Sequence, residues 1–89
     1  MSKTPKQLER YFKGVANHHR IAIMKLIAEN DNITLQSISE TTKISFKNAS
    51  AHTAKLVAAG LVNKRYMSNF VVHSLSPYGE TMLECLNKF

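Results

Sequence analysis

The feature that most constrains the fold is a pair of short helical segments separated by only a few residues. The first is expected to begin after Thr34 and end near Thr42, and the second to begin after Ser45 and end before Gly60. The hydroxyl of Thr or Ser at an N-cap accepts a hydrogen bond from a free backbone N–H of the first turn. Glycine favours the left-handed backbone that often follows a helix. Two short helices joined by residues 42–44, the second of them basic, are typical of a helix-turn-helix.

The segments on either side predict two preceding helices, a hairpin and a final helix. Asn17 suits the N-cap of a helix before the pair, and two β-rich runs flank the turn residues Ser68 and Asn69. Ser76 and Pro77 are a cap and first-turn pair that can open the last helix. The predicted fold is therefore mainly α with a small β-hairpin, a winged helix-turn-helix formed by a single domain over 1–89. The terminal helices are expected over about 5–15 and 77–88, the second helix of the motif over about 45–59, and the wing over about 62–75.

Charge is distributed unevenly along the 89 residues. Lys and Arg number 12 against 6 Asp and Glu, and the formal net charge is +6. Between Lys43 and Tyr66 there are five basic residues and no acidic one. This pattern predicts one surface that faces an anion such as nucleic acid, and the alternative is a chance scatter of charges.

Several classes of protein are excluded by what the sequence lacks. No apolar run approaches the roughly 18–20 residues of a membrane-spanning helix, so no membrane partner is expected. Cys85 is the only cysteine, which excludes an internal disulfide and fits a reducing, cytoplasmic location. No catalytic triad order, glycine-rich phosphate loop or paired carboxylate motif is present. We therefore expect a protein that is not an enzyme and uses no cofactor.

Four motifs in the predicted order resemble those of ArsR-type transcriptional repressors. These are the stretch from Phe12 to Ile21, the segment from Ser45 to His52, the Leu56-to-Val62 exit with its Ala59-Gly60-Leu61-Val62, and the return Leu75-Ser76-Pro77-Tyr78-Gly79. The resemblance covers roughly residues 8–86. It implies a winged helix-turn-helix regulator that binds double-stranded DNA, with a recognition helix beginning at Ser45.

The chain departs from this family at the positions where its metal sensors hold their ligands. Thr34, Leu35 and Gln36 stand in place of the family's Cys-Val-Cys, and the last helix offers only Glu80, Glu84 and Cys85. Neither set forms a credible site for zinc or a softer ion, so no metal is expected. The wing is also short and poor in arginine compared with the family.

An α-helix fits the major groove of DNA, and its N-terminal turns meet the base edges. Lys47 is the candidate for a guanine or a nearby phosphate, Asn48 or Ser50 for a base edge or backbone oxygen, and Ala51 for a thymine methyl group. Phe46 either joins Ala51 or folds back into the core. The full set expected to contact DNA is Lys43, Ser45, Phe46, Lys47, Asn48, Ser50, Ala51, Lys55, Lys64, Arg65 and Asn69. The alternative is that Lys47 and Lys55 are only the solvated side of an amphipathic helix.

The histidines and the cysteine are expected to play structural roles. The imidazoles of His18 and His19 are expected not to face each other, which argues against a shared metal. His52 is expected to be partly buried, His73 to lie on the surface, and Cys85 to be an inert packed thiol.

The terminal helices are expected to form a homodimer. Their apolar stripes offer more aromatic surface than so small a core needs. The stripes are Leu8, Tyr11, Phe12 and Val15 in the first helix and Tyr78, Met82, Leu86 and Phe89 in the last. A twofold axis would place two recognition helices about one DNA turn, roughly 34 Å, apart and predicts an imperfect inverted repeat as the operator. The alternative is that these stripes close the core of the monomer.

Two other functions remain open at this point. One is a protein-interaction scaffold whose basic face binds an acidic partner in a larger assembly, and the other is an RNA-binding winged helix. A steep loss of affinity with salt and an enriched duplex motif would favour DNA. The sequence gives neither the operator, nor the sign of regulation, nor any effector.

Overall fold

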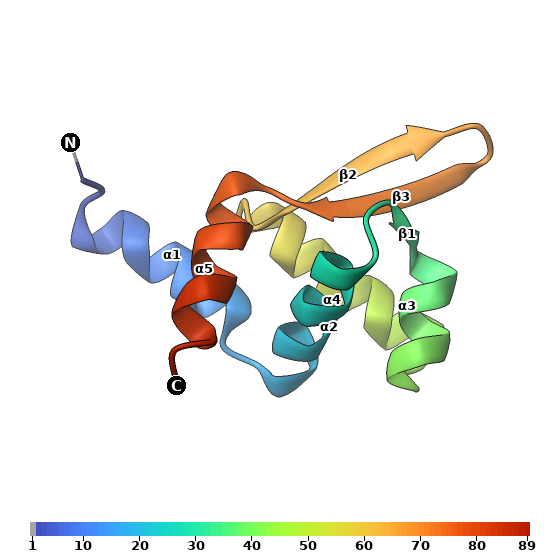
Figure 1. The fold of residues 1–89 in the computed structure, drawn as a ribbon, viewed down its shortest axis with the longest axis horizontal. Coiled ribbons are helices and arrows are strands. Elements are labelled where there is room, and N and C mark those ends of the chain that lie inside the picture. Colours follow the sequence, from blue (N-terminus) through green and yellow to red (C-terminus); the bar gives the residue numbers. More distant parts are fainter. Residues whose placement is uncertain (1) are drawn as a thin grey trace.

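Five helices and a three-stranded sheet occupy residues 2–89, the part of the chain that the computed structural model describes (Figure 1). The elements are α1 (Pro5–Val15), α2 (His18–Glu29), β1 (Ile33–Thr34), α3 (Leu35–Thr42), α4 (Phe46–Ala58), β2 (Val62–Met67), β3 (Phe70–Leu75) and α5 (Pro77–Leu86). The predicted winged helix-turn-helix is confirmed, with the two-residue strand β1 as an addition.

Each helix is preceded by a side chain that caps it. The caps are Thr4, Asn17, Thr34, Ser45 and Ser76, and each accepts a hydrogen bond from a backbone N–H of its first turn. The Ser76 hydroxyl also donates to the carbonyl oxygen of Gly60 at 2.6 Å, and the Ser76 N–H donates to that of Leu61 at 3.1 Å. These bonds join the start of α5 to the residues that follow α4.

Each of the two turns that flank α4 contains a residue with a left-handed backbone conformation. Gly60 follows the helix with φ +82°, a region that glycine enters without steric cost. Lys43 lies in the turn between α3 and α4 with φ 60° and ψ 28°. A lysine at this position is strained relative to glycine, because its Cβ crowds the backbone in the left-handed region.

The sheet is antiparallel with the order β1-β3-β2, so β3 is its central strand. His73 on β3 is paired with Ile33 on one side and Lys64 on the other. Its side chain is only 3% exposed, and its Nδ1 lies 3.3 Å from the carbonyl oxygen of Ile33. The prediction of a surface histidine is therefore wrong, because the ring points toward the helices that pack against β3 and lies against the Ile33 carbonyl of β1.

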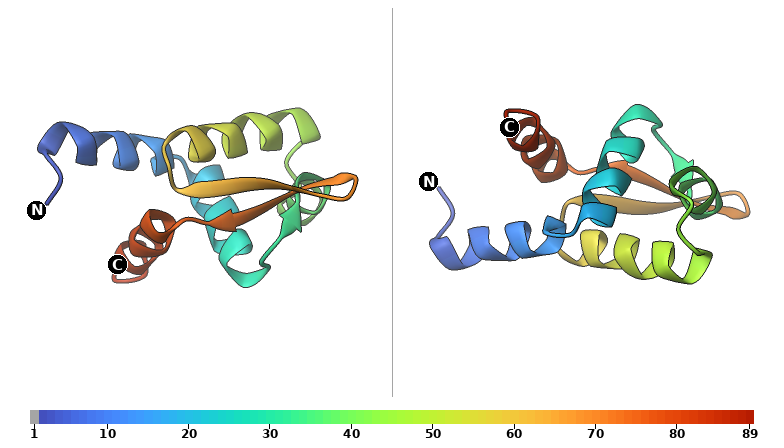
Figure 2. Two further views of the ribbon diagram at one scale, coloured as in Figure 1. Left: turned by 90° about the horizontal axis from the view of Figure 1, so that it is seen from above. Right: turned by 90° about the horizontal axis from the view of Figure 1, so that it is seen from below.

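The core forms around α2. Ile23, Met24 and Ile27 of α2 are fully buried together with Ile38 of α3 and Leu56 of α4. Figure 2 shows α1 and α4 along one edge of the molecule and α5 on the other side of the hairpin. Both termini lie at the end of the molecule that α1 and α5 form (Figure 1). The terminal helices are thus displaced from the turn that begins α4.

Among the described residues, no helix combines the length and apolarity needed to cross a membrane.

Candidate nucleic-acid interface

The helix α4 has one buried and one solvent-exposed side. Ala49, Thr53 and Leu56 face the core, whereas Lys47, Ala51 and Lys55 are exposed. Nothing in residues 2–89 covers the Lys47 side of the helix. Its sequence, FKNASAHTAKLVA, contains no acidic residue, so an approaching phosphate would meet cations without an opposing carboxylate.

The first turn of α4 is open to solvent. Ser45 caps it by accepting a hydrogen bond from the Asn48 N–H at 3.2 Å. Phe46 is 52% exposed and does not fold back into the core, which removes the alternative of a buried staple. Ser45, Lys47 and Asn48 are likewise exposed, and Ser50 is half-buried.

The remaining predicted contacts lie in the turn before α4 and on the wing. Lys43, Lys64, Arg65 and Asn69 are all exposed. The Arg65 guanidinium donates from Nη2 to the Asn32 side-chain oxygen at 2.7 Å, which holds it against the loop before β1. The strand ends beside the turn Ser68–Asn69 carry exposed apolar side chains, those of Tyr66, Met67 and Phe70.

A second group of cations lies beside the C-terminal half of α4. Arg10 and Lys13 of α1, Arg20 of α2 and Lys55 of α4 line a shallow open groove. The sequence analysis did not assign the first three to DNA binding. The excess of basic residues within 1–30 could have indicated that they bind an anion, but only the fold shows that α1 lies next to α4.

Three histidines lie next to this groove. The rings of His18 and His19 are 4.0 Å apart between centroids, so the expectation that they do not face each other is wrong. His52 of α4 follows at 5.4 Å from His19, and its pKa is lowered by burial and then by the charges of Arg20, His19 and His18. Within residues 2–89, no three His, Cys, Asp or Glu side chains are grouped so as to hold a metal ion.

The predicted dimer residues divide into two sets. Tyr11, Val15 and Met82 are buried in the monomer core, and Leu86 packs against that core. Leu8, Phe12, Tyr78 and Phe89 are exposed, with Phe12 and Tyr78 each at 49%. The stripes therefore close the core of the monomer and also leave apolar surface outside it.

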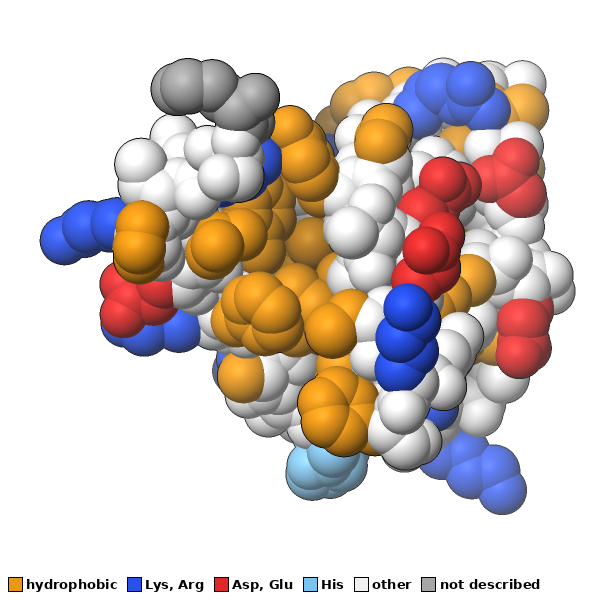
Figure 3. All heavy atoms as spheres, turned by 60° about the vertical axis from the view of Figure 1, so that its left-hand side comes forward, with side chains coloured by type: hydrophobic (Ala, Val, Ile, Leu, Met, Phe, Trp, Pro, Cys, Tyr) orange, Lys and Arg blue, Asp and Glu red, His pale blue; other side chains and the backbone are white. Residues whose placement is uncertain are grey.

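The exposed apolar side chains border a groove between α1 and α5. Leu8, Tyr11, Phe12, Tyr78, Met82 and the half-buried Cys85 line this groove, whose volume is about 470 Å³. Figure 3 shows hydrophobic side chains gathered on this face of the molecule. The rings of Tyr11 and Tyr78 lie 5.1 Å apart between centroids, which joins the two helices across the groove.

Comparison with known proteins agrees with this geometry. Residues 17–63 match the sequence profile of the winged helix-turn-helix DNA-binding family. Among curated proteins, none matches the chain significantly. The structure is similar to that of HlyU from Vibrio cholerae, with a TM-score of 0.85 and 28% identity over 99% of this chain and 96% of that one.

Two further solved structures have the same fold. One is a homodimeric winged helix-turn-helix DNA-binding domain from Mycobacterium bovis, described as a possible ArsR-family transcriptional regulator. Its TM-score is 0.81 and its identity 25%, over 93% of this chain and 76% of that one. The other is NolR from Sinorhizobium fredii, with a TM-score of 0.82 and 19% identity over 99% of this chain and 94% of that one.

Proposed function

The chain belongs to the winged helix-turn-helix DNA-binding family. From this premise we propose that it is a transcriptional regulator of the ArsR type, a sequence-specific repressor that binds duplex DNA as a homodimer. The family is one of DNA-binding proteins and not of enzymes. The observation that carries the proposal is the exposed, acid-free side of α4, which presents Lys47 in its first turn.

In this proposal α4 enters the major groove with its N-terminal turns. Lys47 contacts a guanine O6 or N7, and Asn48 and Ser50 reach a base edge or a backbone oxygen. Phe46 and Ala51 lie against a thymine methyl group, for which their exposure is suitable. These contacts read the sequence of the bases.

The remaining cations position the protein on the DNA backbone. The phosphates are contacted by Lys43, Lys55, Lys64 and Arg65. The backbone N–H groups at the start of α4, just after Ser45, face another phosphate, and Asn69 approaches the DNA from the wing. The groove formed by Arg10, Lys13, Arg20 and Lys55 extends this backbone contact along the side of α4.

The dimer is proposed to form through the groove between α1 and α5. The exposed apolar residues that line it are Leu8, Phe12 and Tyr78, and Phe89 after α5 is exposed as well. A twofold axis would bury these side chains against their copies. The Mycobacterium bovis domain, which has this fold, is homodimeric. The operator is then an imperfect inverted repeat whose half-sites lie about one helical turn, roughly 34 Å, apart.

Selection from random DNA duplexes with the purified protein at physiological salt tests this proposal. We expect an enriched inverted repeat and an affinity that falls steeply with salt, by a slope of about 0.9 for each phosphate contacted. A transcription assay on a promoter that carries the repeat then tests repression. Selection that enriches no motif, or a preference for structured RNA at equal salt, contradicts the proposal.

A further inference from the structure

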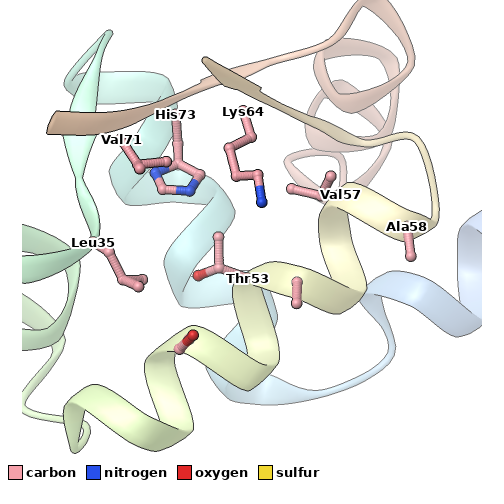
Figure 4. Close-up of a pocket in the computed structure, with 9 residues that line it drawn as sticks. Leu35, Thr53, Val57, Ala58, Lys64, Val71 and His73 are labelled. Carbon is pink, nitrogen blue, oxygen red and sulfur yellow. The ribbon is translucent and has the colours of Figure 1, made fainter. Parts of the chain in front are cut away.

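A hollow of about 340 Å³ lies between the recognition helix α4 and the wing (Figure 4). Its walls are mainly apolar and include Leu35 of α3, Val57 of α4 and Val71 of β3. Pockets for small molecules are typically about 300–1,000 Å³, mostly apolar, with a few polar groups that fix the orientation of the ligand. This hollow therefore has the size and the lining of a small-molecule site.

Thr53 lines the hollow, and its hydroxyl has no hydrogen-bond partner among the described residues. Thr53 is only 3% exposed, and its Oγ1 is buried. A buried hydroxyl without a partner has lost its hydrogen bonds to water and gained none in return, and most such groups in proteins are paired. Rotation about the Cα–Cβ bond of Thr53, which has two favourable rotamers in a helix, would turn this hydroxyl into the hollow, where a ligand oxygen would supply the missing partner.

A cation and an imidazole approach the same hollow from the sheet. Lys64 of β2 and His73 of β3 are paired across the sheet, and Figure 4 shows both side chains directed toward α4. The Ile33 carbonyl can only accept a hydrogen bond, so the Nδ1 of His73 carries the proton and its Nε2 is free to accept. Burial lowers the pKa of His73 below its ordinary value of 6.5, which keeps the ring neutral near pH 7. The positive charge in the hollow thus comes from Lys64.

We propose that this hollow binds a small amphipathic carboxylate. The hydrocarbon part lies against Leu35, Val57 and Val71, and the carboxylate lies between the Lys64 ammonium and the Thr53 hydroxyl. An anion is favoured over a cation because Lys64 is the charged group among the lining residues. The ligand is amphipathic because the rest of the lining is apolar.

Such a ligand is an effector that weakens DNA binding, a consequence that rests on the proposed function. Lys64 is proposed to contact a DNA phosphate, and Ser50, which also lines the hollow, to face the DNA. The ligand carboxylate and the DNA phosphate therefore compete for one ammonium group. The two ligands must weaken each other by the same factor, since coupling between binding sites is reciprocal.

Octanoate, with 1-octanol as its uncharged counterpart, tests the proposal on the free protein. We expect saturable shifts of the methyl resonances of Thr53, Val57 and Val71, and weaker binding of octanol at the same site. The methyl groups of Leu8 serve as the internal reference, because Leu8 lines the distant groove between α1 and α5. Shifts confined to Leu8, or an absence of saturable shifts, would overturn the proposal.

Three variants separate the polar contacts from the apolar ones. K64M is expected to weaken octanoate at least tenfold and to leave octanol unchanged, whereas K25M, at an exposed lysine on α2 away from the hollow, changes neither. T53V keeps the shape of the side chain and is expected to weaken octanoate by about three- to tenfold, the effect of one hydrogen bond. V71F fills the hollow and is expected to abolish both. If the wild type and K64M each bind octanoate as tightly as octanol, the anion site is overturned.

The effect on DNA is measured separately, with the duplex obtained by selection. Saturating octanoate is expected to weaken DNA binding by at least fivefold in the wild type and not in V71F. An unchanged affinity would overturn the effector role. Failure of the duplex selection together with octanoate binding would overturn the proposed function and leave the ligand site standing, so the two failures are distinguishable.

Discussion

Arg20 of α2 donates a hydrogen bond from its Nε to the Nδ1 of His52 on α4, over 3.3 Å. The same guanidinium donates from Nη1 to the carbonyl oxygen of Gly14 at 2.9 Å. One side chain therefore joins the end of α1, the start of α2 and the middle of α4. Because Nδ1 accepts this bond, His52 must be neutral, with its proton on Nε2.

The first prediction concerns this connection. R20Q is expected to lower the free energy of unfolding by about 1–2 kcal/mol, since it removes a charge-assisted bond and a bond to a carbonyl at a partly exposed site. H52A tests the pair through a double-mutant cycle, measured by urea denaturation. A coupling energy of at least about 0.5 kcal/mol is expected for residues in contact. Strict additivity of the two substitutions contradicts the connection.

The second prediction is that acid destabilises the protein through two histidines. Burial lowers the pKa of His73, and burial together with Arg20, His19 and His18 lowers that of His52. A histidine whose pKa is lower in the folded state binds fewer protons there than in the unfolded state. The stability that each contributes is therefore present above pH 6.5 and is lost as the pH falls below it.

Urea denaturation at pH 7.5 and at pH 5.0 measures this effect. H73Q and H52Q are each expected to reduce the dependence of the unfolding free energy on pH. A wild-type stability that rises or stays constant from pH 7.5 to pH 5.0 contradicts the prediction.

The third prediction uses the left-handed turn at Lys43. K43G relieves the strain at φ 60° and is expected to raise the free energy of unfolding by about 1 kcal/mol relative to K43A, which keeps it. Both variants lose the same charge, so both are expected to weaken DNA binding equally. Thermal denaturation and binding to a fixed duplex measure the two effects. Equal stability of K43G and K43A would count against the strain.

The fourth prediction distinguishes the residues that read bases from those that contact phosphates. K47A is expected to weaken binding to the selected operator by about 1–3 kcal/mol and to relax the preference at one base pair. K64A is expected to weaken all duplexes alike and to reduce the salt slope by about one. K25A, at an exposed lysine of α2 outside the proposed set of DNA contacts, serves as the control for the loss of a charge. A uniform loss of affinity in K47A would assign Lys47 to the backbone instead.

The sequence predicted the parts of the fold that depend on local chemistry. Asn17, Ser45 and Ser76 cap helices because a short polar side chain can satisfy the free N–H groups of the turn that follows. The exposed side of α4 could also be predicted, because Ala49 and Leu56 define its buried side at helical spacing.

The parts that the sequence analysis missed depend on contacts between distant segments. Strand β1 has two residues, too few for a periodic pattern, and it exists only because it pairs with β3. The burial of His73 follows from the packing of helices against β3 and from the approach of the Ile33 carbonyl. Arg20 was not assigned to the interface because its bonds to Gly14 and His52 arise where α1, α2 and α4 meet.

The last prediction concerns the dimer. F12D places a charge in the groove between α1 and α5 at a residue that is 49% exposed in the monomer, so the monomer is expected to remain folded. Burying that carboxylate in an apolar interface is costly, so dimerisation is expected to weaken at least a hundredfold in sedimentation experiments. Binding to the inverted repeat falls with it, whereas binding to a single half-site changes little. The matched control is F70D, at an exposed phenylalanine of the wing, which is expected to leave the dimer intact. A dimer that is lost in F70D and kept in F12D would move the interface from the terminal helices to the wing.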